Sequence, residues 1–126
     1  MKYKLTKNKK TIKEITLYQI EALKDFSNVK KGDLGGWIEK ESNLSQQGNC
    51  WVSGDARVYG NAEVYDNARV SGNAEVYDNA WVFDDARVFN DAEVYGDAMV
   101  YGATRVFDSA KVYGSASGFW CCFGLW

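Results

Sequence analysis

Valine returns at every sixth position over half of the chain, and this period organises the whole sequence. From Gly48 to Tyr113, eleven successive units of six residues carry valine at the fifth place and a small residue at the third, from GNCWVS to DSAKVY. The small residue is mostly alanine, with Cys50 and Thr104 as variants. A short fixed period with one aliphatic and one small residue per unit is typical of a β-solenoid. The sequence therefore predicts a stack of coils built from short strands.

The first two places of each unit hold the residues expected at the corners of a coil. They read Gly-Asn, Asp-Asn, Gly-Asp or Asp-Asp in most units. Glycine, asparagine and aspartate tolerate positive φ and bond back to nearby backbone. We expect valine to fill the flat faces of the coil and alanine to fit inside the tight corners.

The segment before the repeat alternates in a strand-like way and predicts a β-hairpin. Tyr3 and Leu5 form one short apolar run, and residues 15–23 form a longer one, with a turn predicted at residues 7–10 (KNKK). A helix over residues 15–26 is the competing interpretation, because Leu17, Ile20 and Leu23 also fit a period of three to four. The hairpin is preferred, and it would cover the open end of the solenoid, which otherwise exposes apolar interior and unpaired strand edge.

Residues 31–37 (KGDLGGW) break the alternation and predict a turn that leads the chain onto the solenoid. They lack the spacing and the Lys-Ser/Thr of a phosphate-binding loop. Ile38, Leu44 and Cys50 then follow at intervals of six, two residues out of phase with the valines, so we expect the phase to be corrected at Gln46-Gln47. The predicted organisation is a cap over residues 1–37, a solenoid over 38–117, and an apolar segment over 118–126 that plugs the last coil or contacts another chain.

Composition narrows the chemistry. The chain of 126 residues contains no histidine, which removes the commonest general base and metal ligand. Cys121 and Cys122 supply too few ligands for zinc, and an odd count of three cysteines is not a disulfide framework. Calcium-binding solenoids need a nine-residue repeat, whereas this period is six. We therefore expect neither a metal nor a cofactor.

The charge is small but unevenly distributed. Up to residue 47 there are ten lysines and six acidic residues, whereas from residue 48 onward there are five basic and eleven acidic residues. Neither half is charged strongly enough to predict nucleic-acid binding. No signal peptide is recognisable, and no stretch reaches the ~18 apolar residues of a membrane-spanning helix, so a cytoplasmic location is expected without membrane insertion.

The repeat resembles the hexapeptide repeats of left-handed parallel β-helices, in which three units form one triangular coil. Within that group, the stretch LGGWIEKESNLSQQGNCWVSG followed by GNAEVYDNARV resembles YdcK-type repeat proteins of bacteria and their phages. The resemblance implies an all-β fold with stacked coils. It also implies that the protein assembles as a trimer or dimer, since left-handed β-helix proteins are often trimers.

Three units per coil would stack residues that are 18 apart, and this sorts the outward side chains into three faces. The arginine face stacks Trp51, Arg69, Arg87 and Arg105 beside Ser53, Ser71, Phe89 and Phe107. The tyrosine face stacks Arg57, Glu75, Glu93 and Lys111 beside Tyr59, Tyr77, Tyr95 and Tyr113. The apolar face stacks Glu63, Trp81 and Met99 beside Tyr65, Phe83 and Tyr101.

Two of these faces are candidate interaction surfaces. Large exposed apolar patches usually mark interfaces. The predicted contact residues on the apolar face are Tyr65, Trp81, Phe83, Met99 and Tyr101. Those in the apolar C-terminal segment are Phe119, Trp120, Phe123 and Trp126. The alternative is an outer aromatic ladder that only supports the sheet. The stacked guanidinium groups of Arg69, Arg87 and Arg105 are candidates for an anionic partner. The alternative is that corner acids such as Asp55, Asp91 and Asp108 neutralise them.

The function expected from these features is that of a non-catalytic interaction protein. It would be a homo-oligomer that recognises a protein or an anionic ligand through one face, and the resemblance to phage-associated repeat proteins allows an accessory factor that blocks a host component. The first alternative is an acyltransferase of the hexapeptide type, which the lack of histidine disfavours because such enzymes typically depend on one. A purely structural spacer is the second alternative.

Overall fold

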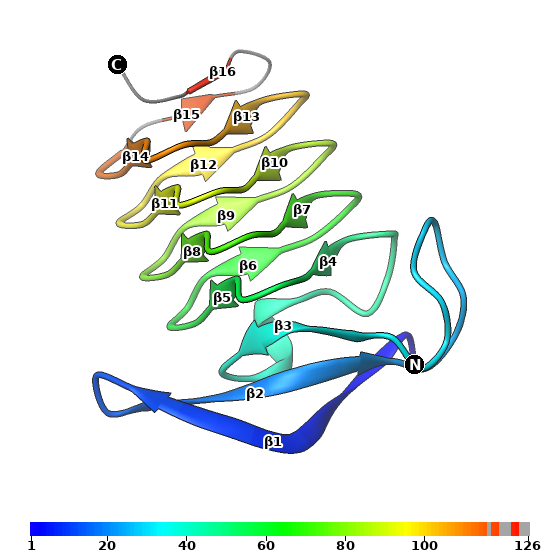
Figure 1. The fold of residues 1–126 in the computed structure, drawn as a ribbon. Coiled ribbons are helices and arrows are strands. Elements are labelled where there is room, and N and C mark those ends of the chain that lie inside the picture. Colours follow the sequence, from blue (N-terminus) through cyan, green and yellow to red (C-terminus); the bar gives the residue numbers. More distant parts are fainter. Residues whose placement is uncertain (116, 119–121, 124–126) are drawn as a thin grey trace.

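The computed structural model describes residues 1–115, 117–118 and 122–123 of the chain. Over these residues the fold is a parallel β-solenoid whose coils stack in one direction, with a hairpin across the N-terminal end (Figure 1). This confirms the predicted fold class. Each strand of the repeat has two residues: β4 Trp51–Val52, β5 Arg57–Val58, β6 Glu63–Val64, β7 Arg69–Val70, β8 Glu75–Val76, β9 Trp81–Val82, β10 Arg87–Val88, β11 Glu93–Val94, β12 Met99–Val100, β13 Arg105–Val106 and β14 Lys111–Val112.

The strands of the repeat pair in parallel with a register of 18 residues, as the period predicts. Val52 pairs with Val70, Val58 with Val76, and Val64 with Val82, which places three strands in each coil. The three resulting sheets contain β4-β7-β10-β13, β5-β8-β11-β14 and β6-β9-β12. Each outward residue of one coil therefore lies directly over its counterpart in the previous coil.

The corners adopt the left-handed backbone conformation that the sequence predicts. The first residue of every unit has a φ between 54° and 72°, whether it is glycine, aspartate or asparagine. Aspartates at these corners also bond to the next coil: Asp66, Asp78 and Asp84 each accept a hydrogen bond from a backbone N–H one coil further on. The corner acids are thus partly engaged in holding coils together.

Valine and alanine form the core of the solenoid. The valines from Val52 to Val112 are all at most 4% exposed, and the small residues at the third place are all at most 7% exposed. Cys50 and Thr104 occupy two of the small positions and are completely buried. Burial of one methyl-rich side chain per strand, repeated along the axis, gives a continuous apolar column.

The N-terminal segment forms the predicted hairpin and not the alternative helix. Strands β1 (Tyr3–Ile12) and β2 (Ile15–Ala22) pair antiparallel. β2 then pairs antiparallel with β3 (Leu34–Ile38), which pairs in parallel with β5. The hairpin therefore covers the first edge of the sheet that underlies the tyrosine face, as Figure 1 shows.

The predicted position of the hairpin turn was wrong. Residues 7–10 lie inside β1, where the register shifts between Leu5 and Lys9, and the turn is formed by Lys13 and Glu14 with φ of 50° and 70°. Ile12 and Ile15 pair directly across it. A two-residue turn with positive φ at both positions matches the twist of the strands, although neither residue is one that usually marks such a turn in a sequence.

The glycine-rich segment is only partly the predicted turn. The turn is confined to Lys31 and Gly32, whereas Gly35 and Gly36 lie within β3. A Cβ added at Gly35 would lie 2.6 Å from the carbonyl oxygen of Val52, and one at Gly36 would lie 2.6 Å from Cγ1 of the same residue. The two glycines therefore allow the cap to approach the first coil closely.

The first coil is out of phase by two residues, as predicted. Ile38 pairs with Val58 and Leu44 with Val64, which are separations of 20 residues instead of 18. A short 3₁₀ helix, η1 (Glu41–Asn43), lies between them, and the buried Asn43 side chain bonds backbone groups on both neighbouring segments. The correction falls between Leu44 and Cys50, where Gln46-Gln47 was expected to provide it.

At the C-terminal end, two short strands extend the stack. β15 (Ser117–Gly118) pairs in parallel with β12, and β16 (Cys122–Phe123) pairs in parallel with β13. Of the predicted contact residues in the apolar tail, Phe119, Trp120 and Trp126 lie outside the described residues, and of Phe123 only the backbone is described. No helix in the described part of the chain is long and apolar enough to cross a membrane.

Candidate functional site

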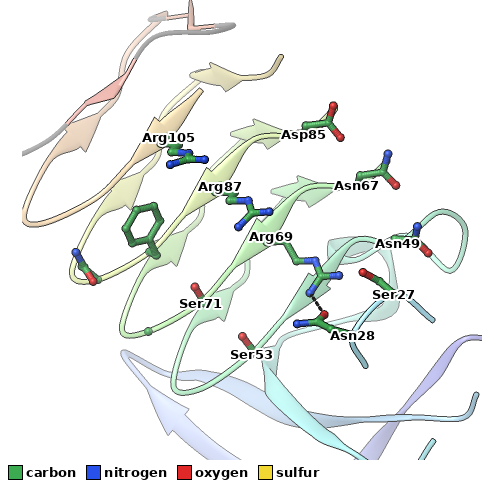
Figure 2. A pocket seen from close by; sticks show the side chains of 13 residues that line it. Ser27, Asn28, Asn49, Ser53, Asn67, Arg69, Ser71, Asp85, Arg87 and Arg105 are labelled. Atoms are coloured by element: carbon green, nitrogen blue, oxygen red, sulfur yellow. Dashed lines mark hydrogen bonds between the residues drawn. The ribbon is translucent and has the colours of Figure 1, made fainter. Parts of the chain in front are cut away.

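The arginine face carries a groove that runs along the axis of the solenoid. Arg69, Arg87 and Arg105 occupy equivalent positions of β7, β10 and β13 and pair in register. They lie along an open groove of about 660 Å³, and Figure 2 shows their side chains following one another from coil to coil. We call this feature the arginine groove. The sequence placed these three residues in one column, and the structure brings them together as predicted.

Polar side chains line both sides of the arginine groove. On the side of the corner lie Asn49, Asn67 and Asp85, one from each successive coil (Figure 2). On the other side lie Ser53, Ser71 and Phe89, which follow the valines of β4, β7 and β10. Amide, hydroxyl and guanidinium groups are thus presented together, and all of them can donate hydrogen bonds to an acceptor-rich ligand.

A loop from the cap closes the N-terminal end of the arginine groove. The backbones of Phe26 and Val29 bond to each other, and Ser27 and Asn28 form the tip between them. Nη1 of Arg69 donates a hydrogen bond of 2.7 Å to Oδ1 of Asn28. No sequence pattern indicates this loop, because Asn28 lies outside the repeat and 41 residues before Arg69.

Trp51 supports that loop and is not part of the ligand-facing column. The sequence placed it at the foot of the arginine column, and the register confirms that position. Its side chain is only 4% exposed and packs edge-on against Phe26, with ring centroids 5.3 Å apart. The first rung of the column is therefore structural, and the three arginines above it face the groove.

The three arginines have no carboxylate partner within the described residues. The ion pairs there join Arg57 to Glu75 and Lys111 to Glu93, all on the tyrosine face. Burial and the positive charge of Arg87 both lower the pKa of Arg69, which means that the column holds like charges in a partly desolvated place. Like charges stacked directly across strands are unfavourable.

Within the described residues, no ion pair joins the corner acids Asp55, Asp91 or Asp108 to the arginine column. Asp91 and Asp108 accept hydrogen bonds from Asn73 and Asn90, the asparagines one coil below. Of the acids in the described part of the chain, Asp85 is the one that lines the arginine groove. One carboxylate beside three guanidinium groups leaves the groove with a net positive charge.

On the tyrosine face, by contrast, tyrosine hydroxyls pair with glutamate carboxylates. The rings of Tyr59, Tyr77, Tyr95 and Tyr113 stack with centroid separations of 5.1 to 5.2 Å. The hydroxyl of Tyr59 donates to Glu75 and that of Tyr77 donates to Glu93, at 2.9 and 3.0 Å. Burial, followed by these hydrogen bonds, raises the pKa of both hydroxyls. This arrangement is a supporting ladder.

The apolar face combines a ring ladder with two exposed side chains. Tyr65 stacks on Phe83 and Phe83 on Tyr101, with centroids 4.9 and 5.2 Å apart. Trp81 and Met99 beside them are 38% and 36% exposed. The five predicted contact residues in the solenoid are therefore adjacent on one surface, with Trp81 and Met99 as its most accessible apolar groups.

A buried lysine near the cap is a further feature that sequence analysis missed. Lys2 is 1% exposed, and its Nζ donates to the carbonyl of Cys50 at 2.8 Å and approaches Sγ of Cys50 at 3.3 Å. Burial lowers the pKa of Lys2 and raises that of Cys50. The ammonium group also bonds the carbonyls of Gln47 and Gly48, so it satisfies backbone acceptors where the first regular coil begins.

The described residues contain no group of three or more His, Cys, Asp and Glu side chains placed to hold a metal ion. The structure therefore defines a parallel β-solenoid with three strands per coil, a hairpin cap, and one polar groove of net positive charge. These features are those of a solenoid repeat protein.

The family model described as "YdcK Beta solenoid repeat" matches residues 62–78 and 92–108 of the chain. A protein of Escherichia coli (strain K12), described as "Uncharacterized acetyltransferase YdcK", is 50% identical over 42 residues. That alignment covers 33% of this chain and 13% of the relative's length. Together with the stacked coils, these matches show YdcK-type repeats at residues 62–78 and 92–108 of the solenoid, in agreement with the resemblance seen in the sequence.

Proposed function

We propose that the protein is a non-catalytic binding scaffold that recognises an anionic ligand through the arginine groove. The observation that carries this proposal is the column of Arg69, Arg87 and Arg105, which lines a groove without a carboxylate partner among the described residues. Stacked like charges cost stability. A bound anion would neutralise the guanidinium groups and so remove their mutual repulsion, which is why the column favours an anionic ligand.

The chemistry of the groove suits phosphate or carboxylate groups. Guanidinium groups bind both bidentately through paired N–H donors. Successive arginines are separated by one coil, about 4.8 Å in a β-stack, so a ligand with two anionic groups can engage neighbouring rungs. Asn67 and Ser71 add neutral donors beside the column, and the partial burial of Arg69 strengthens its attraction to an anion.

The proposal is tested by calorimetric titration with inorganic phosphate, pyrophosphate and citrate at low salt. We expect pyrophosphate to bind more tightly than phosphate, and Arg87→Gln to weaken that binding at least tenfold. The matched control is Arg57→Gln, because Arg57 occupies the equivalent strand position on the tyrosine face and is paired with Glu75. Equal affinity in both variants, or no binding to the unmodified protein, would refute the proposal.

The apolar face supports a second part of the proposal, that the protein assembles with copies of itself. Trp, Tyr, Phe and Met are enriched in interfaces, and Trp81 and Met99 remain exposed on this face. Sedimentation analysis of the purified protein should give a dimer or trimer, and Trp81→Glu should give a monomer. Tyr113→Glu is the control, since Tyr113 is 58% exposed but belongs to the tyrosine face. A monomeric unmodified protein would exclude self-assembly.

If the anionic group belongs to a macromolecule, the scaffold could act by covering a site on it. An accessory factor of a phage that blocks a host component is the biological setting we propose for this chemistry. Capture from bacterial lysate with the unmodified protein and with Arg87→Gln as bait tests it. A partner retained equally by both baits would argue against recognition through the arginine groove.

Acetyl transfer is a second candidate function, and one observation favours it: the matched relative is described as an acetyltransferase. The chain spans 13% of that relative's length, so transfer of its activity to this chain is a separate proposal. Incubation with acetyl-CoA and sugar or amine acceptors, followed by mass spectrometry of the products, tests it directly. Turnover above that of a heat-denatured control would replace the non-catalytic proposal.

A further inference from the structure

The aromatic ladder on the arginine face is interrupted, whereas the ladders on the other two faces are not. On the tyrosine face, all four rungs are tyrosines, and on the apolar face the described rungs are Tyr65, Phe83 and Tyr101. On the arginine face, the same position is filled by Phe107 and Phe89 and then by Ser71 and Ser53. Because Ser53 and Ser71 occupy the ladder position in two successive coils, the ladder has no aromatic ring in either of them.

The missing rings leave an open space beneath Phe89. Where rings are present they stack with centroid separations of 4.9 to 5.5 Å, one per coil. Phe89 stacks on Phe107 on one side only, and its other side faces the rung of Ser71. Ser53, Ser71 and Phe89 all line the arginine groove. Figure 2 shows the small side chains of the two serines beside the arginine column. The space is therefore part of the groove itself.

The arginines lie beside this space at a fixed separation. Ser71 directly follows β7 and lies two residues after Arg69, and Phe89 follows β10 in the same way. Residues two apart in extended backbone point to the same side and are about 6.6 Å apart. A ring placed over Ser71 would therefore have one guanidinium group beside it in its own coil and another in the next coil.

From this juxtaposition we propose that the arginine groove binds a mononucleotide, with its base stacked under Phe89 in the space over Ser71 and Ser53, and its phosphate on Arg69 and Arg87. The inference rests on the proposed anion-binding function and names the ligand class. A sugar between base and phosphate spans the separation between ladder and arginine column. A phosphate attached directly to an aromatic ring would stay closer to the ladder.

The size and polarity of the groove agree with this occupant. Its volume of about 660 Å³ lies within the range of small-molecule sites. Asn67 lies on the far side of the arginine column, where its side-chain amide can donate a hydrogen bond to the phosphate. Base stacking on an aromatic side chain contributes about 1–3 kcal/mol and tolerates every base, so we expect little preference among the four nucleotides.

The first experiment separates the ring from the phosphate. Calorimetric titrations of the full chain with AMP, ribose 5-phosphate and adenosine at low salt are compared. We expect AMP to bind roughly tenfold more tightly than ribose 5-phosphate, which corresponds to about 1.4 kcal/mol of stacking, and adenosine to bind more weakly than AMP. Equal affinities for AMP and ribose 5-phosphate would overturn the inference.

The second experiment fills the space from within the chain. Ser71→Phe adds the missing ring and should reduce AMP affinity to that of ribose 5-phosphate, while pyrophosphate binding stays within twofold of the unmodified protein. Ser71→Ala is the matched control, because it removes the hydroxyl but leaves the space open, and it should bind AMP as the unmodified protein does. Unchanged AMP affinity in Ser71→Phe would contradict the placement of the base.

The outcomes distinguish this inference from the proposed function. If pyrophosphate binds and Arg87→Gln abolishes that binding, but AMP gains nothing from its base, then the anion-binding function stands and the mononucleotide inference fails. If neither AMP nor pyrophosphate binds the unmodified protein, both fail. Thermal denaturation of each variant shows that it is folded, and the comparison of ligands on the unmodified protein needs no variant at all.

Discussion

Replacing Arg87 by glutamine should make the protein more stable while it weakens ligand binding. Arg87 lies between Arg69 and Arg105 in one column, and none of the three has an ion-pair partner among the described residues. Glutamine keeps part of the aliphatic stem and a polar end but removes the charge. Both neighbouring repulsions disappear together.

The magnitude follows from the spacing of the coils. Two unit charges about 5 Å apart repel by about 0.8 kcal/mol in water and by about 3 kcal/mol in a medium of effective dielectric constant ~20. Arg87 and Arg105 are exposed and Arg69 is half-buried, so the lower value is closer for these side chains. Removal of two such repulsions should raise the free energy of unfolding by about 1.6 kcal/mol at low salt.

Urea unfolding followed by circular dichroism, at about 10 mM and about 1 M salt, measures this effect. At the higher ionic strength the Debye length is roughly 3 Å, so the gain in stability should largely vanish. Glu75→Gln is the matched control, because Glu75 has the equivalent strand position on the tyrosine face. It contacts Arg57 at 3.9 Å and accepts a hydrogen bond from Tyr59, so its replacement should destabilise the protein.

Repulsion within the arginine column is refuted if Arg87→Gln destabilises the protein as much as Glu75→Gln does. That outcome would mean that the arginine column contributes to folding, as an ordinary structural ladder would. A stabilisation that does not change with salt would also refute it, because the effect would then arise from packing and not from charge.

Three further predictions concern the core, the cap and the tyrosine ladder. Thr104→Val should raise the free energy of unfolding by about 1 kcal/mol in urea titrations, because the buried Oγ1 of Thr104 has no hydrogen-bond partner; a loss of stability would show that the hydroxyl is satisfied. Gly35→Ala should cost about 1–3 kcal/mol and speed hydrogen exchange in β1–β3, since its Cβ would meet the carbonyl of Val52 at 2.6 Å; unchanged exchange would mean that the cap adjusts freely. Stability should fall as the pH rises above about 10, because the raised pKa values of Tyr59 and Tyr77 keep these hydroxyls protonated in the folded state while the unfolded chain loses the protons. The double variant Tyr59→Phe/Tyr77→Phe should flatten that decline, and an equally steep decline would exclude these two hydroxyls as its cause.

The repeat made most of the solenoid predictable. A period of six with valine and a small residue in each unit fixes which side chains point inward, and the stacking of residues 18 apart then assigns every outward side chain to a column. The register of Arg69 with Arg87 and of Glu75 with Glu93 follows from that arithmetic. The phase shift of Ile38 and Leu44 was also readable, because it breaks the same period.

The cap was predicted only in outline, since it has no period. Alternation was enough to expect a hairpin, but Lys13 and Glu14 are not typical turn residues, and their turn depends on the pairing of Ile12 with Ile15. Gly35 and Gly36 looked like turn residues, whereas they are small because the first coil lies against them. The burial of Lys2 likewise depends on backbone carbonyls from residues more than 40 positions away.

The same division holds for the candidate site. The sequence alone determined that three arginines share a column and that Ser53 and Ser71 interrupt the aromatic ladder beside it, because both facts follow from counting by 18. Only the tertiary structure decided that the column lines a groove, that a loop carrying Ser27 and Asn28 closes its end, and that no described carboxylate pairs with the arginines. The physical reason is that a stacked repeat converts sequence separation directly into position, whereas the cap reaches the groove through contacts that no local pattern encodes.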